Sequence, residues 1–324
     1  MRMSAAAVVG LLLCAAGGLP AEPFHPQRVS AEAKWLVHVD ADAMRGSLVV
    51  DAGYQRYKEK CKAISRQIEE LRTACRVFDP TKDLKAVTFY GTRFNADAGV
   101  AIVQATFSET VLKTLHEAVQ RLPDYKSSRH RQYELHAWTH AKGTKHERNL
   151  IGVYVSPDLM LFGSSPDEVA AALDVLDGVR PSLGVSSPLA AATPVGALVV
   201  VRLAALSAVK LPIQSPILKR IEMLGLTCGE SHREAYLTVH AETQDAKAAG
   251  EVQAAIDSAL NAALLATEDY ELSELINAVQ VSRRGKAVTV DVRGPAQLGW
   301  FFLEKIAAKV VQARKARHEA GKRK

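Results

Sequence analysis

The hexapeptide W-L-V-H-V-D at Trp35–Asp40 is typical of an apolar β-strand, and it runs directly into an alanine-rich turn at Ala41–Met44. The same combination returns about 160 residues later, where the apolar stretch Leu198–Leu203 runs into Ala204–Leu206. A pair of elements that recurs at one long spacing indicates an internal repeat. We therefore compared the order of elements in the two halves of the chain.

The next elements recur in the same order. A hairpin strand, V-A-I-V-Q-A-T-F at Val100–Phe107, lines up with Ala235–Thr243. An amphipathic helix follows in both halves, with apolar residues at spacings of three and four that place them on one face. These residues are Val111, Leu112, Leu115, Val119 and Leu122 in the first half and Val252, Ile256, Ala259, Leu260 and Leu264 in the second.

A second hairpin and a last helix complete each half. The matching strands are Ile151–Ser156 and Leu159–Phe162 in the first half, and Val279–Ser282 and Ala287–Val292 in the second. The first-half helix begins at Ser165-Pro166-Asp167-Glu168, where we expect Ser165 to cap the helix and Pro166 to occupy its first turn. The second-half counterpart is Gly294-Pro295-Ala296-Gln297.

Each half is therefore predicted to be a β-α-β-β-α-β-β-α unit. The fold class is α+β, internally duplicated, with mostly antiparallel sheets and helices packed on one face. We expect a first unit at residues 33–178, a linker rich in glycine, proline and serine at 179–194, a second unit at 195–312, and a basic C-terminal tail at 313–324. The pattern leaves open whether the two sheets remain separate or join edge to edge.

The N-terminus predicts export. Residues 1–21 have the parts of a signal peptide, namely the charge of Arg2, the apolar run Ala5–Ala16 and a small-residue exit at Ala21. That run is too short to span a bilayer, which needs roughly 20 apolar residues. Lipidation at Cys14 is disfavoured because the preceding leucines lack the small residue that lipoprotein processing requires. The mature protein, with an extended segment at 22–32, is expected to be periplasmic or extracellular.

The signal peptide, the acidic V-D-A-D turn at Val39–Asp42 and the duplicated halves together resemble a diffuse set of exported bacterial α+β proteins of unknown function. The resemblance extends over most of the chain. It implies a fold class and export, and it implies no activity and no site residues.

Sequence motifs for catalysis are missing. The chain has no glycine-rich phosphate loop, no Gly-x-Ser-x-Gly elbow, no His-Glu-x-x-His and no paired Cys-x-x-Cys. We therefore expect a non-catalytic protein without a cofactor. The alternative is an exported, hydrolase-like enzyme whose site is assembled from residues distant in sequence. Asp40 and Asp42 are two apart and could form a carboxylate pair, although aspartate at a strand end is more often a turn residue.

Histidines are concentrated between residues 130 and 146, and the candidate metal ligands are His136, His140 and His146. Tyr133–Thr139 alternates apolar and polar residues, which predicts a strand. Residues four apart on a strand lie about 13 Å from each other, so His136 and His140 cannot share one ion there. We therefore predict no metal site.

Basic residues gather around the same segment, which we expect to form a hairpin, and at the C-terminus. Loss of Arg2 with the signal peptide lowers the formal net charge from +6 to +5. An anionic envelope polymer, a membrane surface or a protein partner fits this distribution. Nucleic acid does not, because few aromatic residues are interleaved with the charges. The candidate contact residues are Lys126, Arg129, Arg131, Lys142, Lys145, Arg148, Arg314, Lys315, Arg317, Lys322, Arg323 and Lys324.

A heptad-like apolar pattern at Tyr54–Arg76 predicts a helix that packs on the protein's own sheet, which gives a monomer. Pairing of this helix between two subunits, which gives a homodimer, is the alternative. Cys61 and Cys75 are 14 residues apart, about 21 Å along a helix, and cannot form a disulfide with each other within it. The third mature cysteine is Cys228, and the disulfide state of the three is left open.

The first testable prediction concerns processing. The exported form is expected to begin at Glu22, with cleavage after Gly17 as the alternative, and intact-mass measurement on secreted material distinguishes the two. A secreted chain that keeps Met1, or one that carries acyl groups on Cys14, contradicts the prediction.

Overall fold

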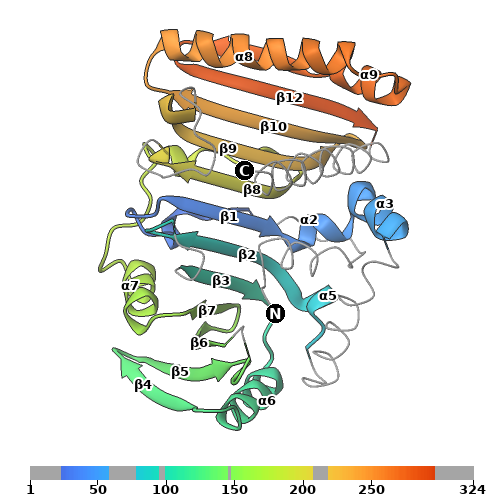
Figure 1. The fold of residues 1–324 in the computed structure, drawn as a ribbon. Coiled ribbons are helices and arrows are strands. Elements are labelled where there is room, and N and C mark those ends of the chain that lie inside the picture. The colour runs from blue at the N-terminus through green and yellow to red at the C-terminus, as the bar shows by residue number, and fades with distance from the viewer. Residues whose placement is uncertain (1–22, 58–77, 95–98, 145–146, 207–217, 296–324) are drawn as a thin grey trace, which may run out of the picture.

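The computed structural model describes residues 23–57, 78–94, 99–144, 147–206 and 218–295 (Figure 1). Within these ranges the chain is an α+β protein, with one twelve-stranded sheet and seven α-helices. Every pair of neighbouring strands is antiparallel. The predicted α+β class and the predicted antiparallel pairing are thus confirmed.

The strands are β1 (Trp35–Asp40), β2 (Leu84–Gly91), β3 (Val100–Ala105), β4 (Lys126–His130), β5 (Tyr133–His140), β6 (Arg148–Ser156), β7 (Leu159–Gly163), β8 (Ala197–Ala204), β9 (Ile221–Ser231), β10 (Glu234–Thr243), β11 (Gln280–Arg284) and β12 (Ala287–Pro295). The helices are α2 (Ala41–Arg45), α3 (Leu48–Tyr57), α5 (Pro80–Asp83), α6 (Glu109–Gln120), α7 (Pro166–Leu176), α8 (Ala246–Leu265) and α9 (Tyr270–Asn277). Three short 3-10 turns are η1 (Pro26–Arg28), η2 (Pro188–Ala190) and η4 (Leu218–Arg220).

The two halves meet at the centre of the sheet, where β1 pairs with β8. Val37 lies opposite Val201 and Val39 lies opposite Val199 in this pair. The sheet order is β11-β12-β10-β9-β8-β1-β2-β3-β7-β6-β5-β4. The question that the sequence left open is therefore answered: the two sheets join edge to edge as one.

The first half contains one hairpin more than the predicted β-α-β-β-α-β-β-α unit. Strands β4 and β5 add to the outer edge of β6, and they have no counterpart among the described strands of the second half. The predicted unit did not include this hairpin, although Tyr133–Thr139 of β5 was predicted to be a strand. Strand β4 was missed because its sequence, K-S-S-R-H, lacks the apolar alternation of a half-buried strand. Its first four residues are exposed.

Helices cover both faces of the sheet, so the prediction that they pack on one face is wrong. Successive residues of a strand point to opposite faces. On one face, Val39 packs with Met44 of α2, Val103 with Leu115 of α6, and Ala241 with Val252 of α8. On the other face, Leu36, Ile102 and Leu161 pack with Val169 and Leu173 of α7. An apolar pattern alone does not tell which face of a fully buried strand a helix will cover.

The segment from residue 23 and the predicted linker are packed together rather than extended. Leu183 donates its N–H to the carbonyl of Val29 over 2.8 Å, and Ala31 donates to that of Pro181 over 3.0 Å. Val29 is completely buried. Beneath them, Arg202 donates to the carbonyl of Leu189 over 2.7 Å, and burial lowers the pKa of this guanidinium to about 10.

The turn after β1 is held by the two aspartates that were considered as a carboxylate pair. Asp40 caps α2, because its Oδ1 accepts a hydrogen bond from Ala43 N over 2.7 Å. Asp42 forms a buried ion pair with Arg45, which also donates to the carbonyls of Thr81 and Leu84. Both carboxylates therefore serve the fold.

A carboxylate from the second half binds the first half. Glu230 of β9 accepts from the Ser47 hydroxyl over 2.8 Å and from Val49 N, in the first turn of α3, over 3.1 Å. The carboxylate satisfies a donor that the start of a helix leaves unpaired, and its charge interacts favourably with the helix dipole.

We expect Glu230→Ala to lower the free energy of unfolding by about 1 to 2 kcal/mol, because it removes a charged acceptor from two partly buried donors. Chemical denaturation measures the change, and Glu32→Ala, at an exposed carboxylate, is the control. If Ser47→Ala and Glu230→Ala prove additive in a double-mutant cycle, the contact does not couple the halves.

Candidate functional site

Helix α6 is strongly amphipathic yet poorly buried. It begins at Ser108, whose hydroxyl accepts from Val111 N over 3.2 Å. Val111 is its one buried residue, while Leu115 and Val119 further along the apolar face remain partly exposed. An apolar face of this kind normally lies flat on a core. In α6, only the start of this face is buried, and the rest of it is partly exposed.

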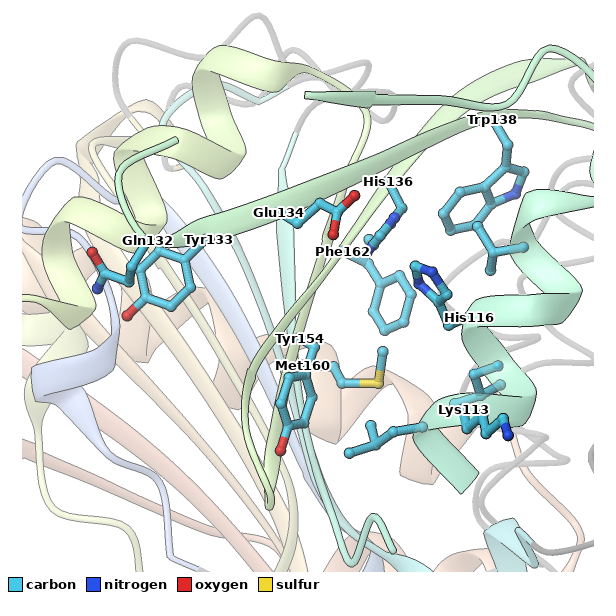
Figure 2. Close-up of a pocket in the computed structure, with 14 residues that line it drawn as sticks. Lys113, His116, Gln132, Tyr133, Glu134, His136, Trp138, Tyr154, Met160 and Phe162 are labelled. Atoms are coloured by element: carbon cyan, nitrogen blue, oxygen red, sulfur yellow. The ribbon is translucent and has the colours of Figure 1, made fainter. Parts of the chain in front are cut away.

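A groove lies beneath this helix, between α6 and strands β5, β6 and β7 (Figure 2). Its volume is about 470 Å³, within the usual range for small-molecule sites. Its lining residues are Leu112, Lys113, Leu115, His116, Val119, Gln132, Tyr133, Glu134, His136, Trp138, Gly152, Tyr154, Met160 and Phe162.

The sheet side of the groove is aromatic. Gly152 of β6 lies between His136 of β5 and Phe162 of β7 in register. A Cβ at Gly152 would lie 3.1 Å from a ring carbon of Phe162 and 3.2 Å from one of Trp138. The absence of a side chain at this position lets the two aromatic rings approach the backbone of β6.

Two imidazoles form the polar contact between α6 and the sheet. The rings of His116 and His136 are 5.0 Å apart, centroid to centroid, and nearly perpendicular. Each has a second partner: Gln120 Nε2 lies 2.7 Å from His116 Nε2, and the Tyr125 hydroxyl lies 2.9 Å from His136 Nδ1. Burial lowers the pKa of His136, against the opposing charge of Glu134, so this ring is neutral near pH 7.

The predicted strand geometry of the histidines is observed, because His136 and His140 lie four apart on β5. His130 contacts Asp174 over 2.9 Å, and His146 lies outside the described residues. Among the residues that the structure describes, no group of three or more histidine, cysteine, aspartate or glutamate side chains is placed to hold a metal ion.

The sequence analysis missed His116, the imidazole that does meet His136. It lies on α6, 20 residues earlier in the chain, so a search for closely spaced histidines passes over it. The available signal was its place beside Leu112 and Leu115 on the apolar side of an amphipathic helix. A polar ring there predicts a polar partner on the surface that the helix faces.

The basic hairpin residues do not converge on one surface. Arg131 pairs with Asp174 over 2.9 Å, and Lys142 with Asp124 over 2.8 Å. Lys126 and Arg129 point to opposite faces because they are three apart on β4. Arg148 is exposed at the start of β6. The other predicted contacts, Lys145, Arg314, Lys315, Arg317, Lys322, Arg323 and Lys324, lie outside the described residues.

The remaining candidates from the sequence are Ser165, the cysteines, the signal peptide and the heptad-patterned helix. Ser165 is the N-cap residue of α7, but its side chain makes no capping hydrogen bond. Cys228 is a free cysteine whose thiol pKa is raised by burial to about 11, which makes it unreactive. The signal peptide at 1–21 and most of the predicted Tyr54–Arg76 helix, including Cys61 and Cys75, lie outside the described residues.

Comparison with known proteins gives no functional assignment. Neither the protein-family models nor the curated proteins contain a match. The chain is similar to three crystal structures of TP0453. Crystal form I has a TM-score of 0.44 at 13% identity and covers 85% of this chain and 94% of that one. Crystal form III has a TM-score of 0.46 at 11% sequence identity and covers 86% of this chain and 96% of that one. Crystal form IV has a TM-score of 0.47 at 9% identity and covers 86% of this chain and 94% of that one.

Among the described residues, no helix combines the length and the apolar character that crossing a bilayer requires.

The histidine geometry leads to a metal prediction. Protein purified without a histidine tag is expected to hold well under one equivalent of zinc by elemental analysis, because two imidazoles fall short of the three or four ligands that zinc usually takes. A stoichiometric ion that is lost in His136→Ala would contradict this.

Proposed function

We propose that this chain is an exported, non-catalytic binding protein, and that the groove beneath α6 holds a small apolar ligand. The observation that carries the proposal is the only partly buried apolar face of α6 above a groove of about 470 Å³. Burial of apolar surface favours binding by about 25 cal/mol per Å², and the part of the apolar face of α6 that stays partly exposed leaves such surface available to a ligand.

We also propose that the two halves arose by duplication. Outward from the β1–β8 pair, the strand order is β1-β2-β3-β7-β6 on one side and β8-β9-β10-β12-β11 on the other. Under this proposal α8 corresponds to α6. The start of α8 packs closely, with Ala248 and Ala249 completely buried and Val252 nearly so. The groove is then a departure of the first half from a shared, closed arrangement.

The lining of the groove supports binding rather than catalysis. The described residues that form it include no serine, threonine or cysteine to act as a nucleophile. His136 Nδ1 contacts a phenol and not the carboxylate that orients a catalytic histidine. The alternative, a hydrolase-like enzyme, would use neutral His136 as a general base toward water.

Contact with an anionic envelope surface or a protein partner remains part of the proposal for the whole molecule. Within the described residues this contact would rest on Lys126, Arg129 and Arg148, which are exposed and form no ion pair among those given by the structure. Such attraction between exposed charges is weak and falls with salt.

The groove is tested with the neutral fluorescent probe N-phenyl-1-naphthylamine. We expect one probe per chain, with fluorescence energy transfer from Trp138, which lies in the lining. Val119→Trp, which fills the groove from α6, is expected to weaken binding by roughly tenfold or more, a loss of about 1.4 kcal/mol of binding free energy.

The matched control is Val185→Trp, which places the same side chain at a residue that is 97% exposed and outside the groove. Equal probe affinity in the two variants, or energy transfer that survives Trp138→Phe unchanged, would show that the probe binds elsewhere and would refute the assignment of the groove.

A further inference from the structure

The hydrogen bonds of the two imidazoles in the groove assign a tautomer to each ring. With the side-chain amide nitrogen of Gln120 as the donor, His116 Nε2 accepts its hydrogen bond over 2.7 Å. A neutral imidazole with an accepting Nε2 carries its proton on Nδ1. His116 therefore offers an N–H donor from the ring atom that faces away from Gln120.

His136 is assigned in the same way. Its Nδ1 lies 2.9 Å from the hydroxyl of Tyr125, and a phenol is a better donor than acceptor, so the hydroxyl donates to Nδ1. The proton of this ring is then on Nε2. Figure 2 shows the two rings next to each other, His116 from the helix and His136 from the sheet.

From this arrangement we propose that the ligand of the groove is an aromatic molecule carrying an oxyanion, such as a carboxylate, sulfonate or phosphate. This inference rests on the proposed function, since it names the ligand class of the same groove. Two adjacent imidazoles, each with one ring N–H in the assigned tautomers, supply donors for an acceptor oxygen, and hydrogen bonds to charged groups are stronger than neutral ones.

The charges around the pair are compatible with an anion. Lys113 lines the groove one helical turn before His116 on α6. Glu134 is the one carboxylate among the described lining residues, and it lies opposite Arg129 of β4 in register, on the same face of the sheet. The local charge from these three residues is net positive.

The apolar body of the ligand is inferred from the rest of the lining. Trp138, Tyr154 and Phe162 come from three adjacent strands and present aromatic rings to the groove opposite the leucines of α6 (Figure 2). Aromatic rings pack favourably edge to face or offset against one another, beyond the contribution of buried area. A planar ring system uses such a lining better than a polar one does.

The experiment compares two probes with the same ring system. N-phenyl-1-naphthylamine is neutral, and 8-anilino-1-naphthalenesulfonate adds one sulfonate to the same body. We expect the sulfonate to bind about tenfold more tightly at pH 7.5, the equivalent of one hydrogen bond to a charged group. Isothermal titration calorimetry and fluorescence titration give both dissociation constants.

The variants His116→Phe and His136→Phe keep a ring at each position and remove its N–H donor. Each is expected to lower the affinity ratio of the two probes toward one, whatever the change in binding of the neutral probe. His140→Phe, on the same strand but outside the lining, is the matched control and should keep the wild-type ratio. If His136→Phe fails to fold, His116→Phe on the partly exposed helix still tests the inference.

The outcomes separate this inference from the proposed function. Binding of the neutral probe without preference for the sulfonate, or a preference that survives both histidine variants, overturns the oxyanion assignment and leaves the groove as an apolar site. Absence of binding by either probe refutes the groove itself.

Discussion

The structure depends on the antiparallel pairing of β1 with β8. These strands stand at the centre of the sheet, five residue pairs join them, and each carries apolar residues toward both faces. Without this pair each half would present a buried, apolar edge strand to water, an arrangement that favours aggregation. The contact of Glu230 with the start of α3 and the packing of residues 23–33 against the linker both bridge the same seam. The two halves therefore share one continuous sheet, and the buried cluster of Val39, Leu198 and Val199 spans the strand pair that joins them.

The groove follows from the way this core ends. Near the centre of the sheet, helices and loops cover both faces closely, as the buried Val39 and Leu36 demonstrate. Toward the outer strands of the first half the cover thins, because the β4–β5 hairpin widens the sheet while α6 keeps only Val111 buried. The hairpin is itself anchored to α7, since His130 and Arg131 contact Asp174 and Tyr133 donates to Asp177 over 2.7 Å. The sheet side of the groove is thus anchored by these contacts, whereas the helix on its other side has a single buried residue, Val111.

Much of the fold could be predicted from sequence, and little of the site. Apolar runs predicted β1, β3 and β8, and apolar residues at spacings of three and four predicted the helices α6 and α8, because burial selects apolar residues on every face that it covers. The polar strand β4 and the helical cover of both faces were not predictable, since exposed edges and fully buried strands carry no one-sided pattern. The contact between His116 and His136 could not be predicted, because it depends on how closely α6 approaches β5. That approach is set by packing across the groove, and no spacing in the sequence encodes it.

The open ends of the sheet have a consequence for association between molecules. In the described part of the chain, β4 and β11 are the terminal strands, and an unpaired strand edge is a template for adding another chain. Both strands are short, five residues each, and both carry cationic side chains, Lys126 and Arg129 on one and Arg283 and Arg284 on the other. Joining two molecules end to end would bring like charges together at every junction, so a sheet of this width is protected from growing into a fibre by electrostatic repulsion.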